Sequence, residues 1–273
     1  MTKPLTVDTL RVPDALLHHE LRGSGPLVVL VGAPMDARAF EGLADLLAGD
    51  HTVLTTDPRG INRSRVDDPS ADSTPEMRAD DLARLIEHVD VGPAVVFGSS
   101  GGAVSALALA AARPDLVRVV VAHEPPLVEL LEDREELVAG TREIIAMHVG
   151  GDAVGAMRKF LAQANIEMPE EVFQVVFGGE RDAQQIADDL FQHERMMLPT
   201  VRWVPDAERL RGVAGRVVVG IGEESGGQIC DRTSRALGEV LGVVPTMFPG
   251  DHIGFVEDPA GFVVRLREVL GSY

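Results

Sequence analysis

Short apolar runs alternate with amphipathic stretches along the first half of the chain. Continuous apolar runs are typical of strands that are covered on both faces of a parallel sheet. Amphipathic stretches such as Pro75–Val89 carry apolar residues at helical spacing. This alternation predicts an α/β fold with right-handed crossovers. Eight segments are expected to be strands: Leu5–Arg11, Ala15–Leu21, Pro26–Val31, Thr52–Thr56, Ala94–Phe97, Leu116–Ala122, Arg216–Ile221 and Val244–Phe248.

The alternation stops between residues 125 and 199, where the pattern predicts helices without a clear strand. The expected helices are Leu127–Val149, Ala153–Ala164, Pro169–Phe177 and Asp182–Met197. Strands and helices then alternate again. We therefore predict a core domain made of residues 1–124 and 200–273, with a helical cap inserted at 125–199. A separate all-helical domain at this place is the alternative.

Composition and charge narrow the class of partner. The chain has 273 residues and a formal net charge of −18, with 25 basic and 43 acidic residues. Nucleic-acid binders need basic patches, and an anionic membrane surface would repel this charge. We therefore expect a small-molecule substrate and neither a nucleic-acid nor a membrane partner, and a homo-oligomer is compatible with the sequence. The single cysteine and the absence of an apolar signal segment predict a cytoplasmic protein.

The pentapeptide at residues 98–102 follows a predicted strand and precedes an alanine-rich helix. It reads Gly-Ser-Ser-Gly-Gly and matches Gly-x-Ser-x-Gly with Ser100 at its centre. A chain that turns at once from strand to helix strains the central residue and needs small residues two positions before and after it. The Ser100 hydroxyl would then be exposed beside a helix N-terminus, as a nucleophile must be. A glycine-rich turn without catalysis and a phosphate-binding loop are the alternatives.

These features resemble the α/β-hydrolase superfamily over essentially the whole chain. Val31–Pro34 lies where the family often has His-Gly-x-Pro. Asp57–Ser64 is similar to the Asp-x-Arg-Gly-x-Gly-x-Ser loop, with Asn62 in place of a glycine. The resemblance implies a mostly parallel eight-stranded sheet flanked by helices, with a helical cap after the sixth strand. It also separates the chain from epoxide hydrolases and haloalkane dehalogenases, which carry an aspartate at the elbow.

The resemblance further implies a triad in the order serine, acid, histidine. Ser100 would be the nucleophile, and His252, which follows the last predicted strand, would be its base. Two residues are candidates for the acid. Glu124 ends the sixth predicted strand before two prolines, where some superfamily members place the acid. Glu224 lies in the turn after the seventh strand, one residue before Ser225, which occupies the usual aspartate position. We favour Glu124 and keep Glu224 as the alternative.

The remaining site residues are expected to assist the triad. Gly101 and Ala33 would supply the two backbone N–H groups of an oxyanion hole, because Pro34 has none. His123, at the end of the sixth predicted strand, is a candidate for contact with substrate, or it only caps the strand. No cofactor and no metal site is expected, because Cys230 stands alone and no ligand spacing is present.

Together these features predict a cofactor-independent serine hydrolase. Its substrate would be a small or medium apolar ester, lactone or thioester, cleaved through an acyl-enzyme on Ser100. The resemblance also allows carbon–carbon bond hydrolysis by the same triad. A biosynthetic cyclase or lyase that uses His252 as a base is one alternative. A non-hydrolytic ligand-binding protein is another, motivated by the missing aspartate at Ser225.

Overall fold

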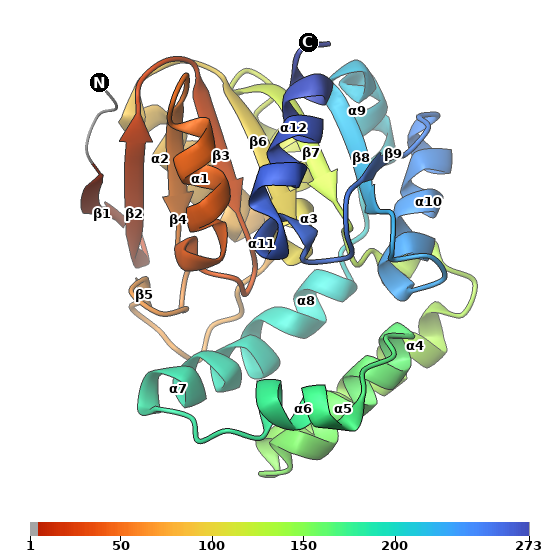
Figure 1. Ribbon diagram of the computed structural model, residues 1–273. Coiled ribbons are helices and arrows are strands. Elements are labelled where there is room, and N and C mark those ends of the chain that lie inside the picture. The colour runs from red at the N-terminus through yellow and green to blue at the C-terminus, as the bar shows by residue number, and fades with distance from the viewer. Residues whose placement is uncertain (1–4, 273) are drawn as a thin grey trace.

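A single twisted sheet forms the centre of the protein (Figure 1). The computed structural model describes residues 5–272. The expectation of no signal segment rests in part on the first four residues, which lie outside this range. Within it, nine strands run in the order β1-β2-β4-β3-β6-β7-β8-β9, and β5 pairs with β2 beside this path. The strands are β1 (Thr6–Val12), β2 (Ala15–Gly23), β3 (Leu27–Val31), β4 (Thr52–Thr56), β5 (Arg65–Val66), β6 (Ala94–Ser99), β7 (Val117–His123), β8 (Val217–Gly222) and β9 (Thr246–Phe248).

The predicted α/β-hydrolase sheet is confirmed. All eight expected strands are present, and the two-residue β5 is the one addition within the described range. Strand β2 pairs antiparallel with β1, β4 and β5, whereas every pair from β4 through β3 to β9 is parallel. The carboxyl ends of the parallel strands therefore meet at one edge of the sheet, where an α/β protein places its ligands.

Helices cover both faces of this sheet. One face carries α1 (Glu41–Leu47), α11 (Gly254–Glu257) and α12 (Pro259–Leu270), which pack over buried phenylalanine rings such as Phe97 and Phe262. The other face carries α2 (Pro75–Val89), α3 (Gly101–Ala112), α9 (Ala207–Gly212) and α10 (Ile229–Leu241), joined by aliphatic residues such as Leu107 and Leu237. Helix α2 has the predicted bounds. It begins after Thr74, because the Thr74 hydroxyl oxygen caps the N-terminus by accepting the Met77 N–H.

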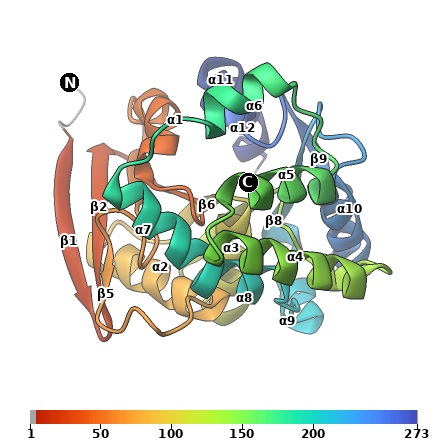
Figure 2. The same ribbon diagram turned by 90° about the horizontal axis from the view of Figure 1, so that it is seen from below.

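The inserted segment forms a layer of helices beside the carboxyl edge of the sheet (Figures 1 and 2). Two of its predicted helices differ from the structure. The one expected at Leu127–Val149 is broken, because the chain is extended at Leu131 between a short 3₁₀ turn and α4. The one expected at Asp182–Met197 changes to a π-helix and continues past residue 199, the predicted end of the cap. The elements are η2 (Val128–Leu130), α4 (Arg134–Val149), α5 (Ala153–Ala164), α6 (Glu170–Phe177), α7 (Ala183–Phe191), η3 (Gln192–Met197) and α8 (Leu198–Val201).

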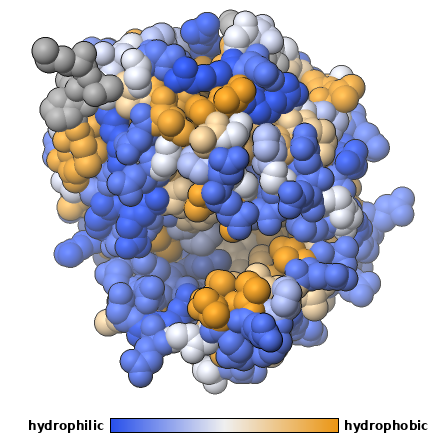
Figure 3. Space-filling model, viewed as in Figure 1, coloured by the Kyte–Doolittle hydropathy of each residue, from blue (hydrophilic) through white to orange (hydrophobic). Residues whose placement is uncertain are grey.

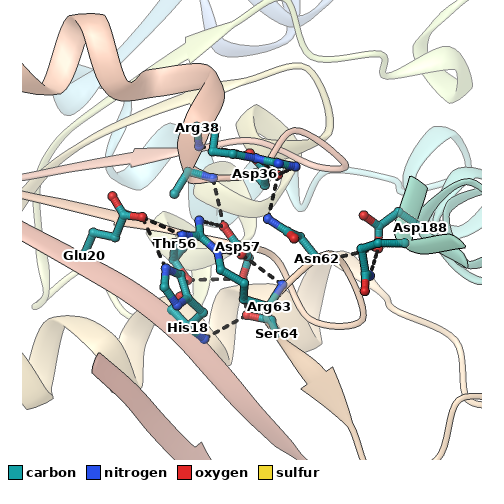
Figure 4. A network of polar contacts seen from close by, with 12 residues as sticks. His18, Glu20, Asp36, Arg38, Thr56, Asp57, Asn62, Arg63, Ser64 and Asp188 are labelled. Carbon is teal, nitrogen blue, oxygen red and sulfur yellow. Dashed lines mark hydrogen bonds and ion pairs between the residues drawn. The ribbon is translucent and has the colours of Figure 1, made fainter. Parts of the chain in front are cut away.

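A buried carboxylate, Asp57, joins the loops that follow β3 and β4 (Figure 4). It accepts hydrogen bonds from the Ala37 N–H at 3.0 Å and from the Arg63 guanidinium at 2.8 and 2.9 Å. Arg63 also donates to Glu20 on β2 at 2.9 Å. Because Ala37 closes the loop that carries Ala33, this network fixes one wall of the expected active site.

The loop after β4 also binds the cap, through Asn62 (Figure 4). Asn62 has a φ of 51°, in the left-handed region that asparagine adopts more readily than most residues. Its backbone N–H donates to Asp188 of α7 at 2.8 Å, and its side-chain amide donates to Asp36 at 2.9 Å. The residue that replaces the family's glycine therefore connects the core to the cap.

We expect Asp57→Ala to lower the free energy of unfolding by about 2–4 kcal/mol. The substitution leaves the Ala37 N–H without its acceptor and leaves Glu20 as the remaining acidic partner of the Arg63 guanidinium. Since the Arg63 side chain is 37% exposed, the loss should fall below that of a fully buried ion pair. Urea unfolding followed by circular dichroism measures it. The control is Asp67→Ala, which removes only the exposed pair with Arg11 and should cost less than about 1 kcal/mol. Equal losses in the two variants would contradict the assigned role of Asp57.

Candidate active site

Ser100 lies at the sharp turn between β6 and α3. Its φ of 56° is one that residues with side chains rarely adopt, at a cost of about 1–3 kcal/mol. The turn is possible because Gly98 and Gly102 approach neighbouring backbone closely. A Cβ atom at Gly98 would lie 2.5 Å from the Gly102 oxygen, and one at Gly102 would lie 2.2 Å from the Val31 oxygen. The strand–turn–helix geometry expected of the pentapeptide is therefore present.

Glu124 and His252 form a close pair beside this turn. The Glu124 Oε2 atom lies 2.5 Å from His252 Nδ1, and Oε1 accepts the Gly222 N–H at 2.8 Å. Burial alone would raise the pKa of Glu124, but the hydrogen bond and charge of His252 outweigh it and lower the pKa to about 2. Burial would lower the pKa of His252, but the nearby Cys230 and the Glu124 carboxylate raise it to about 10. The carboxylate therefore holds the ring and favours its charged form.

Backbone strain also marks Glu124. Its φ is 52°, so two non-glycine residues with a positive φ, Ser100 and Glu124, follow adjacent strands. Such strain persists only where the surroundings enforce it, and it is concentrated at functional sites. Here the Glu124 N–H donates to the Gly220 carbonyl of β8 at 3.0 Å, which turns the side chain toward the end of β8.

The structure does not bring Glu224 to His252. The Glu224 side chain is exposed, and the residue is held by its backbone N–H, which donates to the Gly250 carbonyl at 2.9 Å. Ser225, in the position where the family usually has an aspartate, is buried next to Glu124 and helps to lower the pKa of that carboxyl group. Of the two candidate acids, only Glu124 therefore contacts the histidine.

A cavity of about 320 Å³ lies between the core and the cap, where the surface is hollowed in Figure 3. Ser100, Gly101, Ala33 and His252 line its floor. Its other walls are mostly apolar and include Ile144, Phe160, Met196, Met197 and Val201 from the cap. Among the described residues that line it, none is Lys, Arg, Asp or Glu. The cavity therefore suits a neutral and largely apolar ligand.

The two expected oxyanion donors lie side by side in this cavity. A Cβ at Gly101 would lie 2.4 Å from the Ala33 carbonyl oxygen, so the two backbones are in close contact. Ser100 and His252 both line this cavity. Among the hydrogen bonds of residues 5–272, none joins the Ser100 hydroxyl to the His252 ring. Such contacts are often long in unliganded enzymes and shorten when substrate binds.

The prediction that His123 contacts substrate is wrong. Its ring is fully buried among Phe97, Phe248, Phe255 and Phe262 and does not line the cavity. Burial lowers the pKa of His123 to about 4, which keeps the ring neutral. Only its backbone belongs to the site, since its carbonyl accepts the Ser100 N–H at 2.9 Å.

Sequence reasoning missed the position of Cys230. This half-buried residue, in the first turn of α10, lines the cavity. One donor atom from each of Glu124, Cys230 and His252 lies within 4.8 Å of the other two. Because the three residues are far apart along the chain, no spacing rule reports their proximity. The cysteine that stands alone in the sequence thus has two potential metal ligands as neighbours.

Comparison with known proteins agrees with the fold. Residues 27–266 match the model of the alpha/beta hydrolase family, and the chain belongs to this family. It is 30% identical to the uncharacterized hydrolase YraK of Bacillus subtilis over 275 residues. This alignment covers 96% of this chain and 95% of YraK. A stretch of 110 residues, 40% of this chain and 39% of the relative, is 38% identical to 2-(acetamidomethylene)succinate hydrolase of Mesorhizobium japonicum.

Solved structures show the same fold. A putative epoxide hydrolase from Pseudomonas aeruginosa superposes with a TM-score of 0.69 at 22% identity, covering 98% of this chain and 96% of that one. A thermophilic esterase from Thermogutta terrifontis gives a TM-score of 0.70 at 19% identity and 99% coverage of both chains. A bilayer crossing would need a longer and more apolar helix than any found between residues 5 and 272.

Proposed function

We propose that the protein is a cofactor-independent serine hydrolase of small or medium apolar esters, lactones or thioesters. One observation carries the proposal: Ser100, at a strained elbow, opens into the same apolar cavity as His252, whose other side contacts the buried Glu124. A nucleophile, a base and an orienting acid are the three parts that acyl transfer requires.

In this mechanism, Ser100 Oγ attacks the substrate carbonyl carbon. His252 accepts the hydroxyl proton at Nε2, because Nδ1 faces Glu124, and then delivers it to the leaving group. The Ala33 and Gly101 N–H groups stabilise the negative charge that develops on the carbonyl oxygen. Water, activated by the same ring, then hydrolyses the acyl-enzyme on Ser100.

The cavity lining supports a neutral substrate. A succinate derivative, such as the one in the name of the Mesorhizobium relative, carries carboxylates, and no Lys or Arg among the described lining residues would receive them. Ser100 argues against epoxide opening, since epoxide hydrolases of the superfamily carry an aspartate at the elbow. Carboxylic esters and their cyclic or thiol analogues fit both constraints.

Trapping the covalent intermediate tests the proposal. During turnover of p-nitrophenyl butyrate, acid quenching followed by mass spectrometry should show one butyryl group, located on Ser100. Release of p-nitrophenol should begin with a burst of about one equivalent per protein if deacylation is slow. Turnover that persists in Ser100→Ala, with no adduct in either protein, would favour a cyclase or lyase that uses His252 as a base. Tight ligand binding with negligible turnover would favour a binding protein.

A further inference from the structure

We propose that Glu124, Cys230 and His252, the donor cluster, bind a soft divalent cation such as Zn²⁺, and that its binding reversibly blocks hydrolysis. The binding part stands on the cluster alone. The inhibition part rests on the function proposed above, because it concerns the same histidine.

The positions of the three donors fit one cation. Cys230 lines the cavity, and the His252 side chain is 24% exposed, so a small solute in the cavity lies beside both residues. The donor atoms lie within 4.8 Å of one another. Neighbouring ligands of a tetrahedral zinc ion, at bond lengths of about 2.0–2.3 Å, are separated by about 3.3–3.8 Å. Side-chain rotations that shift the donor atoms by up to about 1 Å would therefore bring the three atoms into one coordination shell.

The kinds of donor select the kind of cation. Thiolate, imidazole and carboxylate are the ligands that zinc takes in proteins, and the thiolate favours soft over hard ions. Mg²⁺ and Ca²⁺ prefer shells made of oxygen, which this cluster does not offer. The net charge of −18 also favours the approach of cations over anions. We therefore expect binding of Zn²⁺ and Co²⁺ and no effect of Mg²⁺.

A bound cation would stop proton transfer. The 2.5 Å between Glu124 Oε2 and His252 Nδ1 is shorter than the spacing of about 3.3 Å between neighbouring ligands of a tetrahedral zinc. The cation therefore displaces the proton between Glu124 and His252, and the two side chains move slightly apart. A neutral imidazole that binds the cation through Nδ1 keeps its proton on Nε2, so it cannot accept the Ser100 proton. The bound cation thus removes the general base.

The chain offers a matched control in the cap. His148 and His193 stack with ring centroids 3.8 Å apart, so this pair could bind a cation outside the donor cluster. The His193 Nδ1 atom lies 2.7 Å from the Asp189 carbonyl oxygen, and no third donor completes a cluster there among the described residues. His148→Gln removes this pair and leaves the donor cluster intact.

Cobalt absorption tests binding without reference to activity. Cys230 is the only cysteine of the chain, so a thiolate-to-cobalt charge-transfer band can arise only from this residue. We expect the band in the wild type and in His148→Gln, and its loss in Cys230→Ser. In the wild type, Zn²⁺ should also slow alkylation of the Cys230 thiol by iodoacetamide, a measurement that needs no variant. A missing band together with unprotected alkylation would overturn the proposal, whatever reaction the protein catalyses.

Inhibition is measured with p-nitrophenyl butyrate, and each variant is normalised to its own rate without metal. Zn²⁺ should inhibit the wild type and His148→Gln equally, and a chelator should restore the rate. For Cys230→Ser, the Zn²⁺ concentration that halves the rate should rise at least about tenfold. Equal sensitivity of the wild type and Cys230→Ser, or loss of inhibition in His148→Gln alone, would overturn the inhibitory role. A protein that gives the cobalt band but hydrolyses no ester would retain the cation site and refute only the proposed function.

Discussion

Ser100→Ala should lower kcat/KM for short p-nitrophenyl esters by about 10⁴-fold or more and should abolish labelling by a fluorophosphonate probe. The substitution removes the attacking oxygen, and the residual rate would come from the oxyanion hole and substrate binding alone. Steady-state kinetics and gel detection of the labelled protein measure the two effects.

The neighbouring serine provides the control for this prediction. Ser99 is fully buried in β6, and its hydroxyl lies 3.4 Å from the ring of His123, which is not part of the cavity. Ser99→Ala should therefore keep both labelling and turnover. Labelling that survives in Ser100→Ala and disappears in Ser99→Ala would identify Ser99 as the nucleophile and refute the assignment of Ser100.

Glu124→Gln should lower kcat/KM by about 10³–10⁴-fold, because an amide can hold the ring in the wrong tautomer and cannot stabilise its charged form. Glu224→Gln, which changes an exposed side chain away from the ring, should stay within about twofold of the wild type. Comparable losses in the two variants would contradict the assignment of the acid.

The pH dependence of kcat/KM is a second test of the role assigned to Glu124. His252 acts as a base only when it is neutral, so kcat/KM rises with pH through the pKa of its ring. The Glu124 carboxylate contributes to raising that pKa, which moves the rise toward alkaline pH. Glu124→Gln should therefore shift the rise to lower pH while reducing the plateau. A shift to higher pH would show that the carboxylate acts on another group.

The sheet could be predicted from the sequence because its strands are nearly continuous apolar runs between turn residues. The elbow could be predicted as well, since a strand, two flanking glycines and a helix constrain Ser100 over a few residues. Glu124 was recognisable from its place at a strand end before Pro125 and Pro126. Each of these features is local, so hydrophobic period and steric demand were enough.

The remaining features depend on contacts between distant segments. The position of His123 at a strand end gave no indication that its ring turns into the phenylalanine cluster. The cap residues that line the cavity, such as Phe160 and Met196, have the same helical spacing as residues that only fill the core. The approach of Cys230 to Glu124 and His252 results from the packing of α10 against the sheet. Sequence periodicity records which residues are buried and does not record what they are buried against.

The tight turn around Ser100 has a consequence for how this enzyme could be altered. Gly98 and Gly102 leave no room for a side chain, because the backbone of their neighbours already occupies that space. Random mutagenesis of the elbow should therefore yield mostly misfolded or inactive protein. Libraries directed at the cap helices, whose side chains form much of the cavity roof, should change substrate preference while the reaction chemistry remains the same. The fold thus separates a part that is fixed from a part that is open to selection.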